Sequence, residues 1–178
     1  MLEDIFHWCD ENKMVVNVSK TKCMCIGSQQ KLSVTSNEIF TIAPSGKQIS
    51  ESDNEKVLCI FIDSTLSWCD HVSYIIKKVN SSLALLKRIK KYLNHKARIL
   101  FYNAYILPHL DYCCSVWGNC SKFLIDSLLK VQKRAARIIL DEHDIRKPSS
   151  ELFQQTGIIP IYKRIQYHKA LLVIIRHY

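Results

Sequence analysis

The chain has 178 residues, and its 25 Lys and Arg against 16 Asp and Glu give a formal net charge of +9 at pH 7. With 48% hydrophobic and 23% charged residues, the composition is that of a globular protein and excludes wholesale disorder. No apolar run approaches the ~20 residues of a membrane span. The acidic opening, Glu3 and Asp4, is unlike a basic secretory leader, so we expect an intracellular protein.

The first part of the chain predicts a mixture of helix and short strands. Apolar residues at helical spacing indicate a helix over 2–12. Short apolar runs at 14–18 and 23–26 predict strand, turn and strand, and a further strand pair is expected over 39–49 around a Pro–Gly turn. The continuous, β-branched run at 57–62 is the strongest strand prediction in the chain.

After about residue 68 the pattern becomes helical and remains so. The second predicted helix, over residues 96–117, is apolar almost all round, so we expect its neighbours to bury it. Pro108 should kink it. The third predicted helix, over residues 121–140, should bury Leu124, Leu128, Gln132, Ala135 and Ile139. The expected helices cover residues 72–93, 96–117, 121–140, 150–156 and 160–177.

Positive charge is concentrated in the middle of the chain. Residues 71–140 contain 13 Lys and Arg but 2 Asp, a net charge of +11, whereas residues 1–70 carry 6 basic and 10 acidic side chains. The basic residues form one-sided clusters with almost no acids to pair with, which favours binding of a nucleic-acid backbone; a solvated face is the other interpretation. The candidate residues are Lys77, Lys78, Arg88 and Lys91 on the first helix of this region, and Lys130, Lys133, Arg134 and Arg137 on the third.

The spacing of the eight Cys residues does not fit a metal site. No C-x-x-C pair occurs, and Cys69-Asp70-His71 has no second ligand pair, so we expect no bound metal. An intracellular chain keeps its thiols reduced. We therefore expect free cysteines that serve mostly as small core residues.

Three strings carry a further signal. The first is Ile5-x-x-Trp8-Cys9-x-x-Asn12-Lys13-Met14-x-x-Asn17-x-x-Lys20-Thr21-Lys22-x-Met24. The second is Val57-Leu58-Cys59-Ile60-Phe61-Ile62-Asp63-x-x-Leu66-x-Trp68-x-x-His71. The third is Tyr105-Ile106-Leu107-Pro108-x-Leu110-x-Tyr112, followed by Val116-Trp117-Gly118 and Leu129-x-x-Gln132-x-x-Ala135-x-Arg137. In order and spacing they resemble the end of the palm and the thumb of non-LTR (LINE/jockey-like) retrotransposon reverse transcriptases, except that Cys59 stands where the family usually has Gly.

The resemblance implies an RNA-directed DNA polymerase. In that family two Mg²⁺ ions, held by palm carboxylates, activate the primer 3′-hydroxyl and stabilise the leaving pyrophosphate. The family keeps an adjacent Asp-Asp pair upstream of the first string, and this sequence contains no such pair. We therefore expect a fragment that begins inside the palm, contributes template–primer binding, holds no cofactor of its own and does not polymerise alone.

Individual residues have a functional and a structural interpretation. Lys20 is a weak candidate for a cation near the incoming nucleotide, although a turn lysine with its tip in water is favoured. We expect Asp63 to cap the turn after its strand, and we assign the histidines and tryptophans of the strings to packing or helix starts. The residues so assigned are His71, His109, Trp68 and Trp117; Tyr92, Tyr102 and Tyr105 are expected in the core or at its rim.

Taken together, the sequence predicts an α+β fold. Residues 1–68 would form the C-terminal part of a palm with a helix and short antiparallel strands, and residues 69–178 a mainly helical, thumb-like unit. The expected partner is the backbone of an RNA or DNA template–primer. Two alternatives stay open: a helical module that binds a protein partner, or itself, through exposed apolar surface, and a transposon remnant without function.

Overall fold

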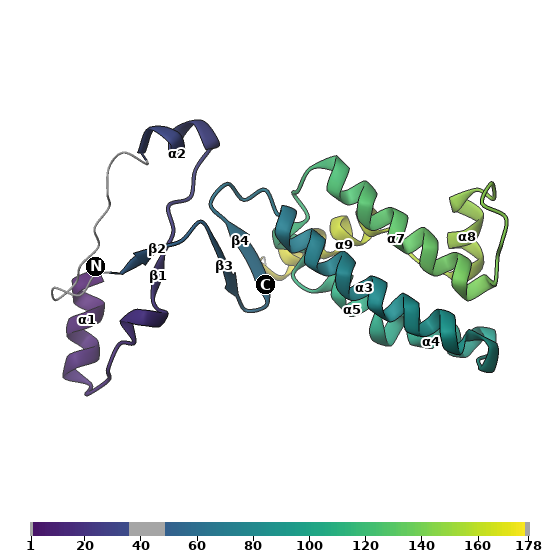
Figure 1. Cartoon of the computed structure of the whole chain (residues 1–178), viewed down its shortest axis with the longest axis horizontal. Helices are drawn as coiled ribbons and strands as arrows, with labels where there is room; N and C mark the ends of the chain where they lie inside the picture. The colour runs from purple at the N-terminus through teal and green to yellow at the C-terminus, as the bar shows by residue number, and fades with distance from the viewer. Residues whose placement is uncertain (1, 36–48, 177–178) are drawn as a thin grey trace. The chain divides into compact units, whose positions relative to one another are not determined.

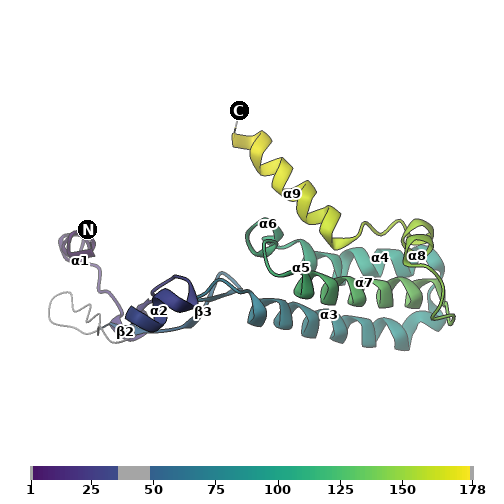
Figure 2. The same ribbon diagram turned by 90° about the horizontal axis from the view of Figure 1, so that it is seen from above.

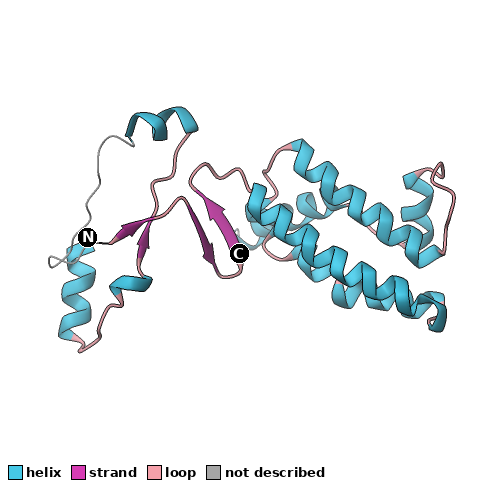
Figure 3. Ribbon diagram, in the orientation of Figure 1, coloured by secondary structure: helices cyan, strands magenta, loops and turns pink. Residues whose placement is uncertain are grey.

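The computed structural model describes residues 2–35 and 49–176, and the chain divides into two compact units, Met1–Ser67 and Trp68–Tyr178. The fold is α+β with helices predominant, and the strands of the described residues form two-stranded sheets (Figure 3). The strand pair predicted over 39–49 falls almost entirely outside the described residues.

The first unit begins with helix α1, Leu2–Glu11, as predicted. The helix ends where the Asn12 side-chain amide donates to the Trp8 carbonyl at 2.8 Å and where Lys13 adopts a left-handed φ of 56°. A polar side chain that satisfies one of the last carbonyls, followed by a left-handed residue, is a common way for a helix to end.

Of the strand, turn and strand predicted over 14–26, the first strand is wrong, whereas a turn and a short second strand do form in this region. The chain instead forms a 3₁₀ turn, η1 (Val18–Lys20), followed by a short strand, β1 (Lys22–Cys23), and a helix that the sequence did not predict, α2 (Gln29–Thr35). The Asn17 side-chain oxygen accepts from the Lys20 amide at 3.2 Å, so a local bond competes with strand pairing here. β1 pairs in parallel with β2 (Ser50–Glu51), so the expectation that the strands of this unit are antiparallel is wrong for this pair.

The single strand predicted over 57–62 is also wrong, because the run folds back on itself. β3 (Asn54–Val57) and β4 (Ile60–Asp63) form an antiparallel hairpin in which Val57 faces Ile60. The two residues between them are Leu58 at φ 47° and Cys59 at φ 66°, the backbone of a two-residue turn that favours Gly. A glycine would adopt this left-handed backbone without strain, whereas Cys59 adopts it at a steric cost.

Asp63 caps the turn that follows this hairpin, as predicted. Its Oδ1 accepts from the backbone amides of Thr65 at 3.1 Å and Ser67 at 2.9 Å. The Thr65 hydroxyl adds a third bond at 2.6 Å. The carboxylate therefore has a structural role at the end of the first unit.

The second unit is a bundle of helices. Helix α4 runs back along α3, and α7 lies beside α3. Helix α9 leaves the bundle obliquely (Figures 1 and 2). Between them lie short helices and one 3₁₀ turn. The elements are α3 (Cys69–Ile89), η3 (Lys90–Tyr92), α4 (His95–Tyr105), α5 (Leu107–Asp111), α6 (Cys114–Trp117), α7 (Lys122–Leu140), α8 (Ser149–Thr156) and α9 (Ile161–Arg176).

The predicted core face of α7 is confirmed, and α3 buries a stripe of the same kind. On α3 the side chains of Val72, Ile75, Val79, Leu83 and Leu86 are buried at the spacing of one helical stripe. On α7 the five predicted core residues, Gln132 among them, are all buried. Burial of these two stripes holds α3 and α7 together.

The helix predicted over 96–117 is divided into three. α4 ends at Tyr105, and Pro108 lies in the first turn of α5, where its missing N–H costs no helical bond. Cys113 at φ 49° then separates α5 from α6. The predicted burial on all sides is also wrong, since Leu100 is 68% exposed.

All eight cysteines are free, but they are not mostly core residues as expected. Cys114 is buried, whereas Cys25, Cys59 and Cys69 are exposed and the remaining four are half-buried. The prediction failed because it took burial from residue type, and these thiols lie in turns and at helix ends.

Candidate nucleic-acid interface

The predicted basic residues of α3 and η3 are all exposed, but they do not share one side of the helix. Lys77, Arg88 and Lys91 fall within about 60° of each other at 100° per residue, opposite the buried stripe. Lys78 is rotated by one residue toward α4, where its ammonium lies 5.6 Å from the centre of the Tyr74 ring.

The predicted basic residues of α7 divide in the same way. Lys130 and Arg134 are exposed, and the Arg134 Nη1 donates to the Asn80 side chain of α3 at 3.3 Å. Lys133 and Arg137 are half-buried, and the Arg137 Nη2 donates to the Ile145 carbonyl at 3.1 Å, in the loop before α8. Arg137 is thus partly committed to holding that loop.

The packing of α3 against α7 brings the two exposed groups together. The helices run in the same direction, because Arg134 meets Asn80 part-way along and Lys90, just after α3, pairs with Asp141 at the end of α7. Residues one turn earlier, Lys77 and Lys130, therefore lie at a similar level. We call Lys77, Lys87, Arg88, Lys91, Lys130 and Arg134 the basic face, with Lys133 and Arg137 at its margin near α8.

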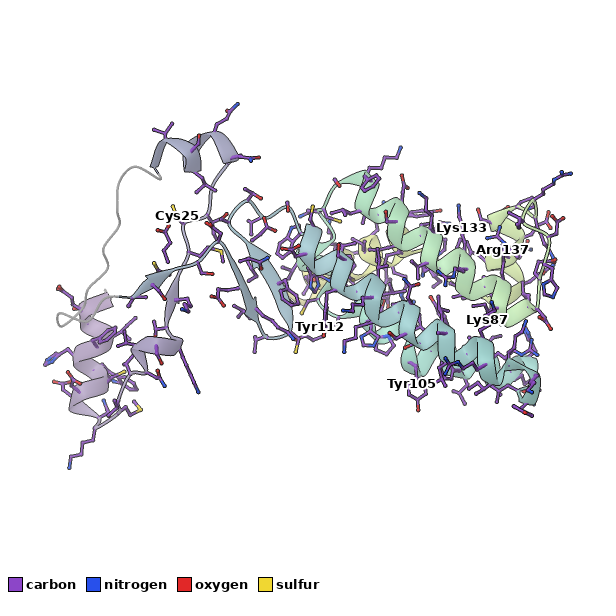
Figure 4. All side chains as sticks on the ribbon, in the orientation of Figure 1. Cys25, Lys87, Tyr105, Tyr112, Lys133 and Arg137 are labelled. Carbon is purple, nitrogen blue, oxygen red and sulfur yellow. The ribbon has the colours of Figure 1, made fainter. Side chains whose placement is uncertain are left out.

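Lys87 is the member of the basic face that the sequence analysis missed. It is exposed and lies two turns after Asn80, so it shares the side of α3 that bonds to α7. Figure 4 shows Lys87 on α3 across from Lys133 and Arg137 on α7. The residue spacing alone could not find it, because the sequence does not say on which side of α3 the other helix packs.

Three acids of the second unit, Asp111, Asp141 and Glu142, pair with cations outside the basic face. Lys147 lies 2.8 Å from Glu142 and holds the pKa of that carboxyl down to about 2. The Arg164 guanidinium donates to both oxygens of Asp111, at 2.6 and 2.5 Å. Throughout residues 2–35 and 49–176, no carboxylate forms an ion pair with a member of the basic face. The face therefore presents unneutralised positive charge.

The weak catalytic candidate, Lys20, lies in the exposed turn η1 of the first unit. Asn17 caps this turn by accepting from the Lys20 amide, and the lysine side chain has the setting of a surface residue. The structure thus gives it a turn position and supplies no reactive neighbour among the residues that it describes.

Of the residues assigned to packing or helix starts, His71, Trp68 and Trp117 are buried in the second unit. His71 is 2% exposed, and burial lowers its pKa. Its ring contacts Trp117 edge-on with the ring centres 5.7 Å apart, and Trp117 and Trp68 are both buried. His109, in contrast, is exposed on α5. Tyr102 is buried, whereas Tyr92 and Tyr105 are exposed by 77% and 58%.

A metal site or a membrane span does not emerge from the described residues. Within these ranges, no three His, Cys, Asp or Glu side chains converge as a metal site would require. None of the described helices combines the length and the apolar composition needed to cross a bilayer.

A cleft of about 470 Å³ lies between α7, α8 and the start of α9, lined by apolar residues such as Leu129, Phe153 and Tyr162 together with Lys163.

Comparison with known proteins gives one informative relationship. No protein-family model and no solved structure matches the chain. An uncharacterized protein of Caenorhabditis elegans is 29% identical over 122 residues, which cover 68% of this chain and 59% of that protein. The chain thus spans less than two thirds of this relative's length, and the relative's name states no activity.

Proposed function

We propose that the second unit is a nucleic-acid-binding thumb and that the chain derives from a reverse transcriptase of the non-LTR retrotransposon type. The observation that carries the proposal is the basic face, where six cations from α3, η3 and α7 have no carboxylate partners among the described residues. Such clusters repel one another unless a polyanion neutralises them. Phosphate contacts of this kind position a duplex without reading its sequence.

The order of the three strings supports the assignment to a palm end followed by a thumb. The hairpin of β3 and β4 would correspond to the primer-grip strands, since its turn places a left-handed residue where the family has Gly. The bundle that follows would be the thumb. The family name rests on these strings and on no other comparison.

Polymerisation is not proposed for these residues. The reaction of the family needs carboxylates that converge on two Mg²⁺ ions. Among the residues that the structure describes, the acids do not form such a group, so these residues do not fit a pair of Mg²⁺ ions. The proposed activity is therefore binding, in which the helical unit would hold a template–primer for chemistry performed by other residues.

Salt dependence tests the proposal directly. The full chain should bind an RNA–DNA hybrid duplex with a logarithmic slope of about −4 to −7 against salt, if ~4–8 phosphates are contacted. Between 50 and 200 mM salt the affinity should fall by about 10²–10⁴-fold, measured by fluorescence anisotropy. An affinity that does not change with salt would contradict backbone binding.

A pair of charge reversals locates the site. Lys77→Glu with Lys130→Glu should weaken duplex binding and reduce the salt slope by at least about 2, because each exposed lysine would lose one phosphate contact. Lys13→Glu with Lys20→Glu is the matched control, with the same change in net charge on exposed residues of the first unit. Equal losses in both pairs would show that net charge, and not the basic face, decides affinity.

A second candidate function, docking of a protein partner, is favoured by the end of α9. Leu172, Val173 and Ile174 are each more than half exposed there, on consecutive positions of one helix. Apolar docking responds little to salt, so the same titration separates the two functions. Leu172→Asp would weaken protein docking while leaving duplex binding unchanged.

A further inference from the structure

A different surface of the second unit lies where α3 packs against α4. Tyr74 and Lys78 are one turn apart on α3, with the Lys78 ammonium over the Tyr74 ring. One turn further, the Ser82 hydroxyl donates to the Tyr105 carbonyl at 3.3 Å and so places the end of α4 beside this row. From Tyr74 to Ser82 the row extends over about 12 Å at 1.5 Å per residue.

Tyr105 and Tyr112 are exposed by 58% and 48%; contacts with buried residues hold the ring of Tyr105 and the backbone of Tyr112. The Tyr105 ring stacks on the buried Phe101 ring, with centres 4.8 Å apart. The Tyr112 carbonyl accepts the indole N–H of Trp117 at 2.9 Å, and Trp117 is fully buried. Figure 4 shows the two tyrosines along one edge of the helical unit. We call Tyr74, Lys78, Tyr105 and Tyr112 the tyrosine face.

The charge around this face has one sign. The sequence contains no Asp or Glu between Asp70 and Asp111, a stretch that supplies all of α3 beyond its second residue and all of α4. Asp111 itself is bonded to Arg164. Exposed aromatic rings next to a lysine match the chemistry of unpaired bases on a phosphate backbone. A protein partner would not by itself require this freedom from acids.

We propose that the tyrosine face binds single-stranded nucleic acid, with bases stacking on Tyr105 and Tyr112 and a phosphate held by Lys78. Every base has a flat π surface, so such stacking tolerates any sequence. The site differs from the basic face, because Lys78 lies beside Tyr74 on the α4 side of α3, about 100° around the helix from Lys77. The helical unit would thus hold an unpaired strand and a duplex on separate surfaces.

The test compares two ligands on the full chain, an oligouridine of about 12 nucleotides and an RNA–DNA hybrid duplex, by fluorescence anisotropy at fixed salt. Tyr105→Ala with Tyr112→Ala removes two stacked bases and should weaken oligouridine binding by about thirtyfold or more, while leaving duplex binding within about twofold. Tyr105→Phe with Tyr112→Phe should retain binding, since the ring is kept. Tyr167→Ala, which removes another tyrosine exposed by 60%, is the matched control.

A second readout does not depend on loss of affinity. In Tyr105→Trp the new indole emission should be quenched by oligouridine, while Tyr167→Trp should show no such change. Unchanged oligouridine binding in the double alanine variant, or an equal loss for the duplex, would overturn the proposal. If the chain binds the duplex but not the oligouridine, the tyrosine-face proposal is refuted and the proposed function is not. If Lys77→Glu with Lys130→Glu leaves duplex binding unchanged while the tyrosine variants lose oligouridine binding, the basic-face proposal is refuted and the tyrosine face is not.

Discussion

Replacing the buried Gln132 by methionine should destabilise the helical unit by about 2–5 kcal/mol. The Gln132 side chain is 1% exposed, and its Nε2 donates to the Tyr102 hydroxyl at 3.0 Å and to the Ile159 carbonyl at 3.3 Å. Its Oε1 accepts from the Ile161 amide at 2.7 Å. Methionine has a similar volume but makes none of these bonds, so three buried groups lose a partner at about 1–3 kcal/mol each, partly offset by the more apolar side chain.

Urea denaturation followed by circular dichroism would measure this loss. Tyr102→Phe is the control, since it removes one of the three bonds and should cost about 1 kcal/mol. The double variant should lose less than the sum of the two single losses, because both remove the same bond. A loss below about 1 kcal/mol for Gln132→Met with an unchanged m-value would refute the view that this amide joins α4, α7 and the start of α9.

Two further predictions concern the hairpin turn and an ion pair. Cys59→Gly should stabilise the β3–β4 hairpin by about 0.5–1 kcal/mol, because relief of the left-handed strain outweighs the backbone entropy that glycine loses on folding. Amide hydrogen exchange in the hairpin should become slower in this variant and should not change in the control, Cys25→Gly. Lys147 lowers the pKa of Glu142 from 4.5 to about 2, so the ionised carboxyl stabilises the fold above pH 4.5 and this contribution is lost as the pH falls toward 2. In Glu142→Gln the melting temperature should therefore depend less on pH between 2 and 4.5. An unchanged pH dependence in the variant would contradict the role given to this ion pair.

The long helices could be predicted from the sequence because burial leaves a periodic record. Val72 to Leu86 on α3 and Leu124 to Ile139 on α7 repeat at helical spacing, and both helices form as expected. The hairpin at Leu58 and Cys59 could not, because an apolar run carries no sign that two of its residues adopt a left-handed backbone. Residue type suggests a turn only when Gly or Asn occupies such positions.

The candidate interface was predictable in composition but not in arrangement. The sequence shows that α3 and α7 are rich in lysine and arginine and poor in acids. It does not show on which side of α3 the partner helices pack, and this decides that Lys87 joins the basic face while Lys78 joins Tyr74. The distribution of cations between two surfaces is a property of tertiary packing.

The uneven use of acids in the second unit links its stability to its proposed ligand. Asp111, Asp141 and Glu142 neutralise Arg164, Lys90 and Lys147, and these pairs join segments distant in sequence or close a loop. The basic face receives no such help from the described acids, and its like charges oppose the packing of α3 on α7. A polyanion that binds this face removes that repulsion and stabilises the folded state by RT ln(1 + [L]/Kd), where [L] is the free polyanion concentration. Charge that weakens the free bundle would therefore be the same charge that makes binding favourable.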